Sequence, residues 1–185
     1  MLKLAAMDVA KLTYDDFVRF PDDGRRHELI DGEHYVTPSP NWPHQWVSKR
    51  LFRYLEDYFE PRGLGTVFYA PLDVILSRHD VVEPDVLVAR PSQLTGQWID
   101  GPPLLAIEIL SPSSARTDRY VKFRRYAEFG IDHYWIADPD ARTIECYRVR
   151  EDRYDLIARA GEGEPLTHPD FPGLSIPTDD LWAAK

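Results

Sequence analysis

The sequence predicts an α/β fold in which a mixed β-sheet is flanked by two main helices. Two segments carry apolar residues at helical spacing, and short segments of strand character lie before, between and after them. The nearly continuous apolar run 104–110 is typical of a strand buried on both faces. Because 185 residues can bury a sizeable core, we expect a single domain over 1–185, with 1–12 as a loosely ordered, non-targeting leader.

The first part of the chain is predicted to form a short helix, a hairpin and a long helix. Thr13 is a suitable N-cap for the short helix. The hairpin covers 26–36, because Asp31-Gly32 separates two strand-like stretches and glycine accepts a positive φ. The long helix, 43–60, follows a proline-rich turn and carries apolar residues at helical spacing.

The remainder of the chain is predicted to alternate strands with one further helix. Residues 91–103 form a long loop, and a proline-punctuated tail, 171–177, closes over the body. The expected helix is 115–129, and the expected strands are 66–76 with a possible break at Pro71, 81–88, 104–110, 133–137, 142–150 and 154–160.

Charge and cysteine content narrow the class of protein. The net charge of −9 speaks against a protein that coats nucleic acid nonspecifically, although acidic residues around a metal site are compatible with a nuclease. The single cysteine, Cys146, excludes an internal disulfide framework and a multi-cysteine metal site. No apolar run approaches the roughly 18 residues that a membrane helix needs. We therefore expect a protein of the reducing cytoplasm.

Two carboxylates stand where they predict a metal site. Glu108 lies inside the apolar run 104–110, where a carboxylate without a partner is costly to desolvate. Asp85 lies at the mouth of the preceding apolar strand, so two adjacent strands would present both side chains to one cavity. Carboxylate oxygens, waters and a substrate phosphate are common ligands of Mg²⁺, and Mn²⁺ accepts similar ligands.

Lys122 is the candidate for a basic group beside this metal. It lies in the helix that follows the strand of Glu108, and helical side chains lean toward the N-terminus of their helix. A long lysine side chain can therefore reach back toward the strand ends. There it would stabilise the charge that develops on an attacked phosphate.

These residues lie in motifs that resemble a known family. Glu83-Pro84-Asp85 followed by Ala106-Ile107-Glu108 is similar to the signature of the PD-(D/E)XK nuclease superfamily. More closely, the chain from about Leu12 to Trp182 resembles the Uma-type family of inferred restriction endonucleases. The motifs that carry this resemblance are HELIDGE, APLDV, EPDVLV, IEILSPSS, DRYVKFRRYAEFGIDHYWIADP and FPGLSIP.

The resemblance implies a restriction-endonuclease-like domain that binds a divalent metal. By resemblance, Asp85 and Glu108 carry over as catalytic metal ligands and Lys122 as the catalytic lysine. Glu28, in the HELIDGE hairpin, matches an acidic position beside the metal. The chain departs from the wider superfamily at Leu110, where the superfamily has its lysine two residues after the carboxylate. The Uma-type pattern has this lysine in the following helix.

Each candidate residue also has a purely structural interpretation, and for Asp85 it is that of a turn residue at a strand end after Pro84. Glu108 and Lys122 can form a buried salt bridge without catalysis. Lys122 can instead pair with Asp118 four positions earlier, and Glu28 with an arginine across its hairpin. His44 is expected to be a partly exposed residue in the first turn of its helix, with contact to substrate as the alternative. The arginines of the second main helix form either a solvated face or a strip that contacts phosphates, and they are Arg116, Arg119, Arg124 and Arg125.

Three functional hypotheses follow. The first is a Mg²⁺-dependent nuclease that hydrolyses phosphodiester bonds in DNA, with a homodimer suited to cutting both strands of a duplex. The second is a nuclease-fold protein with little or no turnover, which acts as a nucleic-acid-binding or structural homodimer. The third is a metal-dependent hydrolase of a smaller phosphoester, which would act on nucleotides but not on polymers.

Overall fold

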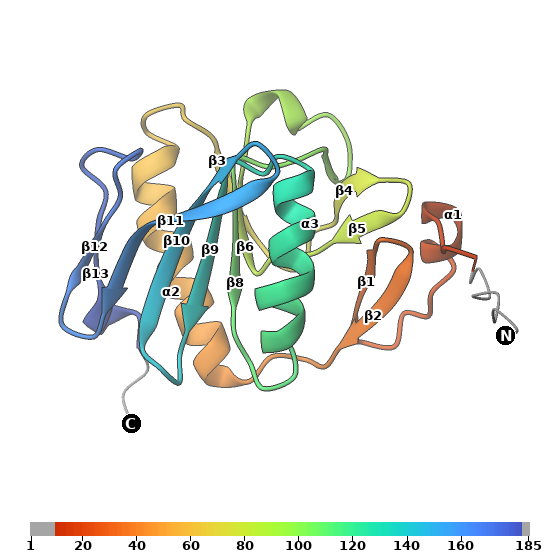
Figure 1. Cartoon of the computed structure of the whole chain (residues 1–185), viewed down its shortest axis with the longest axis horizontal. Coiled ribbons are helices and arrows are strands. Elements are labelled where there is room, and N and C mark those ends of the chain that lie inside the picture. Colours follow the sequence, from red (N-terminus) through yellow and green to blue (C-terminus); the bar gives the residue numbers. More distant parts are fainter. Residues whose placement is uncertain (1–9, 183–185) are drawn as a thin grey trace, which may run out of the picture.

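The computed structural model describes residues 10–182. At its centre lies a six-stranded mixed sheet in the order β11-β10-β9-β8-β6-β3 (Figure 1). β8 and β9 run parallel, and the other neighbours run antiparallel. The strands are β3 (Thr66–Tyr69), β6 (Val86–Ala89), β8 (Leu105–Ile109), β9 (His133–Asp138), β10 (Thr143–Arg150) and β11 (Arg153–Gly161).

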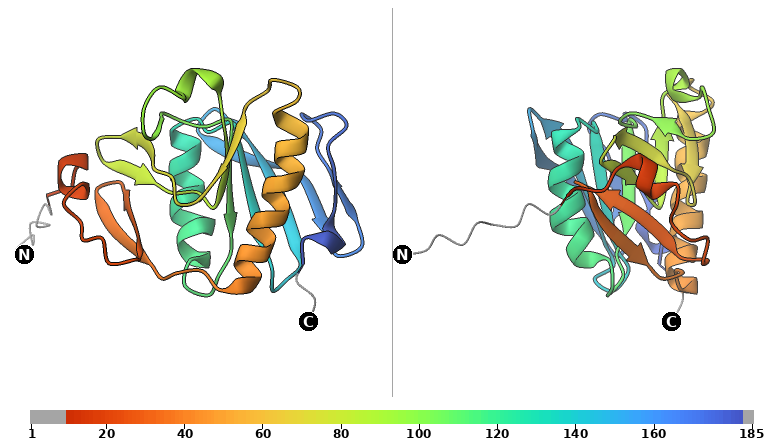
Figure 2. Two further views of the ribbon diagram at one scale, coloured as in Figure 1. Left: turned by 180° about the vertical axis from the view of Figure 1, so that it is seen from behind. Right: turned by 90° about the vertical axis from the view of Figure 1, so that its right-hand side faces the viewer.

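Two helical layers cover opposite faces of this sheet, as Figure 2 shows. One layer is α2 (Trp42–Phe59). The other is a continuous helix made of the π-helical turn η2 (Thr117–Lys122) and α3 (Phe123–Glu128). The predicted arrangement of a mixed sheet between two main helices is therefore confirmed.

Successive side chains of β8 point to opposite faces of the sheet, so each one packs toward one of the two helices. Leu105, Ile107 and Ile109 belong to the apolar core on the α2 side, whereas Ala106 belongs to the core beneath α3. Glu108 stands two residues after Ala106 and therefore points to the α3 side. The strand is buried on both faces, as the apolar run predicts.

A second, five-stranded sheet lies beside the first, in the order β2-β1-β5-β4-β7 (Figure 1). β1 and β2 form the predicted hairpin, with positive φ values of 52° at Asp31 and 76° at Gly32 in the turn. The strands are β1 (Arg26–Ile30), β2 (Glu33–Thr37), β4 (Val74–Ser77), β5 (Asp80–Val82) and β7 (Ile99–Asp100).

The start of the described chain packs against this hairpin. Residues 1–9 of the predicted leader lie outside the described residues. Leu12 donates its backbone amide to the carbonyl of Gly32 at 3.0 Å. The short helix α1 (Tyr14–Phe17) then begins after Thr13, the N-cap that the sequence predicts.

Three segments differ from the prediction. The strand expected over 81–88 is two strands, β5 and β6, in different sheets, because Pro84 has no amide donor and interrupts the ladder. The loop 91–103 contains a short 3-10 helix, η1 (Pro91–Gln93), and strand β7. The helix expected over 115–129 includes the π-helical turn η2, which its apolar spacing does not reveal.

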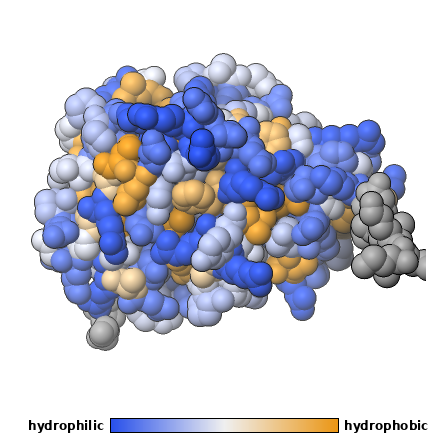
Figure 3. Space-filling model, in the orientation of Figure 1, coloured by the Kyte–Doolittle hydropathy of each residue, from blue (hydrophilic) through white to orange (hydrophobic). Residues whose placement is uncertain are grey.

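The tail closes over the α2 side of the central sheet, as predicted. It forms a small two-stranded sheet of β12 (Pro165–Thr167) and β13 (Ser175–Pro177), followed by η3 (Thr178–Asp180). Phe171 and Ile176 from the tail join the apolar core on that side. The opposite face of the molecule, which bears α3, is mainly hydrophilic with scattered apolar residues (Figure 3). Across 10–182, none of the helices has the length and apolar character that crossing a membrane requires.

Candidate metal and active site

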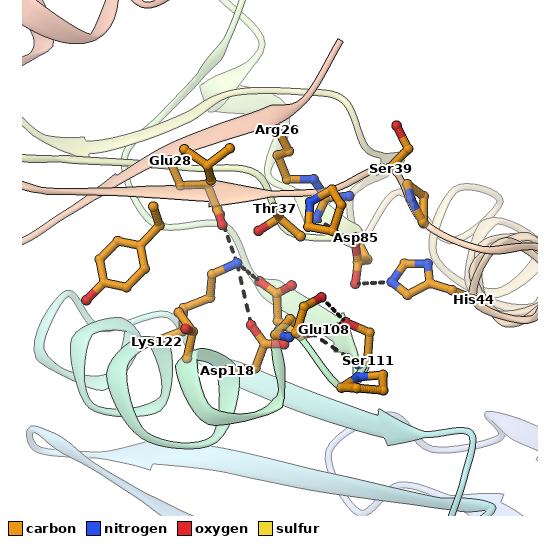
Figure 4. A pocket seen from close by; sticks show the side chains of 18 of the residues that line it. Arg26, Glu28, Thr37, Ser39, His44, Asp85, Glu108, Ser111, Asp118 and Lys122 are labelled. Carbon is orange, nitrogen blue, oxygen red and sulfur yellow. Dashed lines mark hydrogen bonds and ion pairs between the residues drawn. The ribbon is translucent and has the colours of Figure 1, made fainter. Parts of the chain in front are cut away.

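Asp85 and Glu108 come together where β6 and β8 lie side by side. The strands pair antiparallel with Val86 opposite Ile107, so the residue before β6 lies next to Glu108. The backbone amide of Ile109 donates to Asp85 Oδ2 at 2.8 Å and fixes this approach. Asp85 is 3% exposed and Glu108 is 1% exposed. Both line one wall of a cavity of about 390 Å³ (Figure 4).

Two side chains from outside the central sheet hold Asp85. Arg26, in β1, donates to Oδ1 at 2.7 Å, and His44 Nε2, in the first turn of α2, lies 3.0 Å from Oδ2. Burial alone would raise the pKa of Asp85, but the hydrogen bond from His44 and the charge of Arg26 outweigh burial and hold this pKa below its ordinary value. Asp85 is therefore a carboxylate at neutral pH.

Glu108 and Glu28 share the ammonium group of Lys122. Lys122 Nζ lies 3.0 Å from Glu108 Oε1 and 2.8 Å from Glu28 Oε1, and the Tyr126 hydroxyl donates to the same Glu108 oxygen at 2.9 Å. Burial raises the pKa of Glu108 well above its ordinary value, although Lys122 opposes this effect. The hydrogen bonds that Glu108 makes within residues 10–182 both use Oε1, so Oε2 is the oxygen that can take a further ligand.

The π-helical turn η2 brings Lys122 into this cluster. Lys122 and Asp118 both belong to that turn, both are 2% exposed, and Nζ lies 3.7 Å from Asp118 Oδ1. Burial would lower the pKa of Lys122, but Glu108 and its neighbouring carboxylates raise it well above its ordinary value. Lys122 is therefore a charged ammonium that reaches back toward the strand ends, as expected. π-helical turns within α-helices are frequent at functional sites.

Carboxylates outnumber permanent cations around the cavity. Lys122 and Arg26 are the cations in contact with the cluster, whereas the buried acids of the cluster are Glu28, Asp85, Glu108 and Asp118. Carboxylate oxygens are the ligands that Mg²⁺ prefers in proteins, and a divalent cation would offset the excess negative charge. The donor set therefore fits such an ion.

This charge excess predicts an unusual dependence of stability on pH. Burial raises the pKa of Asp118 from 3.8 to about 6, so between these values Asp118 binds a proton in the folded state but not in the unfolded state. We expect the free energy of unfolding in EDTA to fall as pH rises from about 4 to about 6, by up to about 3 kcal/mol from Asp118. The depressed pKa of Asp85 acts in the opposite direction, but only below about pH 4.

Urea unfolding of wild type and Asp118→Asn at pH 4.5 and 7 checks this expectation. The substitution removes the titration while keeping the size of the side chain. We expect the variant to lose less stability than wild type over that interval. An identical loss in both proteins would contradict the account of Asp118.

The four residues singled out from the sequence lie in one cluster with Asp118, which the sequence offers as the partner of Lys122 four positions earlier, and three further members were not predicted. Arg26, His44 and Tyr126 contact the carboxylates directly. The expectation for His44 is wrong, because it is 9% exposed and its ring points to Asp85 (Figure 4). The sequence feature that could have indicated this contact is the position of His44, three residues after the helix N-cap and beside the turn that leads from β2.

Three of the four arginines of the second main helix, Arg119, Arg124 and Arg125, form ion pairs outside the cavity lining. Arg119 pairs with Glu145 at 2.7 Å, and Arg125 pairs with Asp80 at 2.7 Å. These contacts favour the interpretation of a charge-balanced face over that of a strip that contacts phosphates.

The chain is similar to known proteins in both sequence and structure. The sequence model of the Uma2 family, described as "Putative restriction endonuclease", matches residues 14–179. An uncharacterized protein of Synechocystis sp. is 26% identical over 176 residues, which cover 93% of this chain and 92% of that protein. A crystal structure from Anabaena variabilis, described as a "putative nuclease belonging to DUF820", superposes with a TM-score of 0.77 at 22% identity and covers 92% of this chain and 97% of that chain. The predicted restriction-endonuclease-like fold is thereby confirmed.

Proposed function

The chain belongs to the Uma2 family, and on this premise we propose that it is a Mg²⁺-dependent nuclease that hydrolyses phosphodiester bonds in DNA. Asp85 and Glu108 would hold the metal, and Glu28 would complete the acidic set. Lys122 would act beside them as the catalytic lysine. Mn²⁺ is the expected substitute for Mg²⁺, because it binds the same oxygen ligands.

The convergence of four buried carboxylates on one cavity carries this proposal. These carboxylates outnumber Lys122 and Arg26, the permanent cations that contact them, and desolvating such an excess of negative charge is costly. A divalent metal bound there would polarise the phosphoryl oxygen and lower the pKa of an attacking water. Glu108 Oε2 is the oxygen that is free of hydrogen bonds for this purpose among the described contacts.

The chain's own side chains supply positioning and charge. Lys122 holds a fixed ammonium beside Glu108, where negative charge on an attacked phosphate would develop. Arg26 and His44 fix the orientation of Asp85 and keep it ionised. Serine and threonine hydroxyls along the cavity can donate to phosphate oxygens, and those of the described lining are Thr37, Ser39, Ser111, Ser113, Ser114 and Thr117.

DNA is proposed as the substrate because a cleft-bound metal and these hydroxyls suit a phosphodiester backbone. A homodimer would present two such sites to the two strands of a duplex. A cytoplasmic location agrees with the one cysteine, Cys146, which is a buried free thiol.

A second candidate is a nuclease-fold protein that binds nucleic acid without turnover. It is favoured by one observation: Lys122 and Arg26 already occupy carboxylate oxygens of Glu108 and Asp85. If the metal does not compete with these internal cations, the cluster is a structural ion-pair network.

The test is cleavage of matched substrates by wild-type protein with Mg²⁺, with Mn²⁺ and with EDTA. Double-stranded DNA, single-stranded DNA, RNA and bis(p-nitrophenyl) phosphate separate polymer cleavage from hydrolysis of small phosphoesters. We expect cleavage of DNA in either metal and none in EDTA. Metal and DNA binding without cleavage of any substrate would favour the second candidate.

His44 is expected to be a positioning residue for Asp85. We expect His44→Ala to lower the rate of DNA cleavage by about 10- to 100-fold, the range found when a residue that orients a metal ligand is removed. His44→Gln should retain more activity, because its amide can still donate to Asp85. Rates measured over a Mg²⁺ titration check this, with His79→Gln as the control outside the cavity. Equal rates in all four proteins would contradict the assignment.

A further inference from the structure

A second cluster of possible ligands lies away from the cavity, where the tail meets the central sheet. It consists of His133, at the start of β9, and of His168 and Asp170, between β12 and β13. One nitrogen or oxygen atom from each of the three lies within 4.8 Å of the others. His133 is 6% exposed and His168 is 4% exposed.

This cluster is separate from the site of Glu108. In the parallel pair of β8 and β9, His133 stands opposite Leu105, at the start of β8, whereas Glu108 stands near its end. His133 also faces the α2 side, because Tyr134 belongs to the core on the α3 side and neighbouring strand residues alternate.

Three polar atoms of this cluster are buried and have no hydrogen-bond partner among the described residues. They are His133 Nδ1, His168 Nε2 and Asp170 Oδ2. Buried polar atoms are almost always satisfied in proteins, so three orphan atoms in one place point to something that they bind. His133 Nδ1 and Asp170 Oδ2 lie 4.0 Å apart, which is too long for a hydrogen bond but leaves room for an ion between them after a small contraction.

We propose that His133, His168 and Asp170 bind a late first-row divalent cation, for which Zn²⁺ is the probe. Two imidazoles and one carboxylate, with a water as fourth ligand, are a ligand set that suits Zn²⁺ and does not suit Mg²⁺. The ion would fasten the tail to β9, since one ligand comes from the sheet and two come from the tail. It would therefore stabilise the fold and take no part in the chemistry at Glu108.

The neighbouring hydrogen bonds show which contacts an ion would leave in place and which it would break. Arg148, directly across from His133 in β10, donates to Asp170 Oδ1 at 2.8 Å and leaves Oδ2 for the ion. The amide of Asp170 donates to His168 Nδ1 at 3.2 Å, so the ring without an ion carries its proton on Nε2. Ligation through Nε2 requires the other tautomer and the loss of that long hydrogen bond. His168 also lines a surface pocket of about 400 Å³, which provides an entry path.

The experiment is a Zn²⁺ titration of metal-stripped full-length protein, followed by calorimetry, with Co²⁺ absorption as a second readout. We expect one high-affinity ion per chain and a higher melting temperature with Zn²⁺. His133→Gln, His168→Gln and Asp170→Asn should each weaken binding by at least about tenfold. Asp170→Asn keeps the test decisive if a histidine variant does not fold, because Asp170 is partly exposed and its replacement is isosteric.

Two control variants separate this proposal from other metal sites. Glu108→Gln should retain the Zn²⁺ site, so its loss there would place the ion in the nuclease cavity and overturn the proposal. His34→Gln removes the second close pair of histidines, in which His27 Nδ1 and His34 Nε2 lie 2.9 Å apart, and should also retain binding. No Zn²⁺ uptake by wild type, or uptake that survives all three ligand variants, would likewise overturn it.

Discussion

Replacement of Glu108 by glutamine is expected to reduce metal-dependent DNA cleavage at least about a thousandfold, a loss of about 4 kcal/mol in transition-state stabilisation. The amide keeps the shape of the side chain and can still contact Tyr126 and Lys122. It removes the negative charge that would hold a divalent cation. Cleavage rates measured over a Mg²⁺ titration check this, and a weakened metal dependence should accompany the loss.

Glu108→Gln should not lower the free energy of unfolding. Glu108 belongs to an excess of buried carboxylates, and burial already raises its pKa. We therefore expect the variant to unfold in EDTA at the same or a higher urea concentration than wild type. Glu128→Gln, at an exposed position in α3, is the matched control and should cleave normally. A Glu108→Gln protein that keeps more than a tenth of the activity would contradict the role of Glu108.

Replacement of Lys122 by methionine is expected to produce the largest loss of stability. Lys122 is 2% exposed and contacts Glu28, Glu108 and Asp118, which would be left as buried carboxylates without their ammonium. Breaking a buried ion pair on one side costs about 3–5 kcal/mol. Urea unfolding at pH 7.5 in EDTA checks this value, and cleavage should also be lost.

The loss of stability in Lys122→Met should become smaller as pH falls. Burial raises the pKa of Glu108 and of Asp118, so both take up protons more readily than ordinary carboxylates and relieve the repulsion at pH 5. Lys49→Met, at an exposed position on α2, is the control and should change stability little. A Lys122→Met protein as stable as wild type at pH 7.5 would contradict the ion cluster.

Periodicity in the sequence predicts most of the fold. Apolar residues at helical spacing identify α2, and the continuous apolar run identifies β8, because burial on both faces requires it. The Asp31-Gly32 turn fixes the β1–β2 hairpin through its positive φ angles. The division of 81–88 between two sheets was not predicted, since both halves are equally apolar and the break depends on Pro84.

The sequence predicts the carboxylates of the site and Lys122, but not Arg26 or His44. Glu108 stands out because a charge inside an apolar strand is costly, and Asp85 because it precedes a similar strand. Arg26 and His44 carry no such signal. They reach Asp85 only because the hairpin and the start of α2 fold against the ends of β6 and β8, and single-sequence patterns do not report contacts between such distant segments.

Metal binding by Asp85 and Glu108 is best tested by a crystal structure of the wild-type protein with Mn²⁺, in which the ion is located by its anomalous scattering. We expect an ion bound by the carboxylates of Asp85 and Glu108, with Lys122 still beside the cluster. A cavity without an ion at saturating Mn²⁺, with Lys122 and Arg26 keeping their present contacts to both carboxylates, would contradict it. An ion found solely at His133, His168 and Asp170 would contradict it as well.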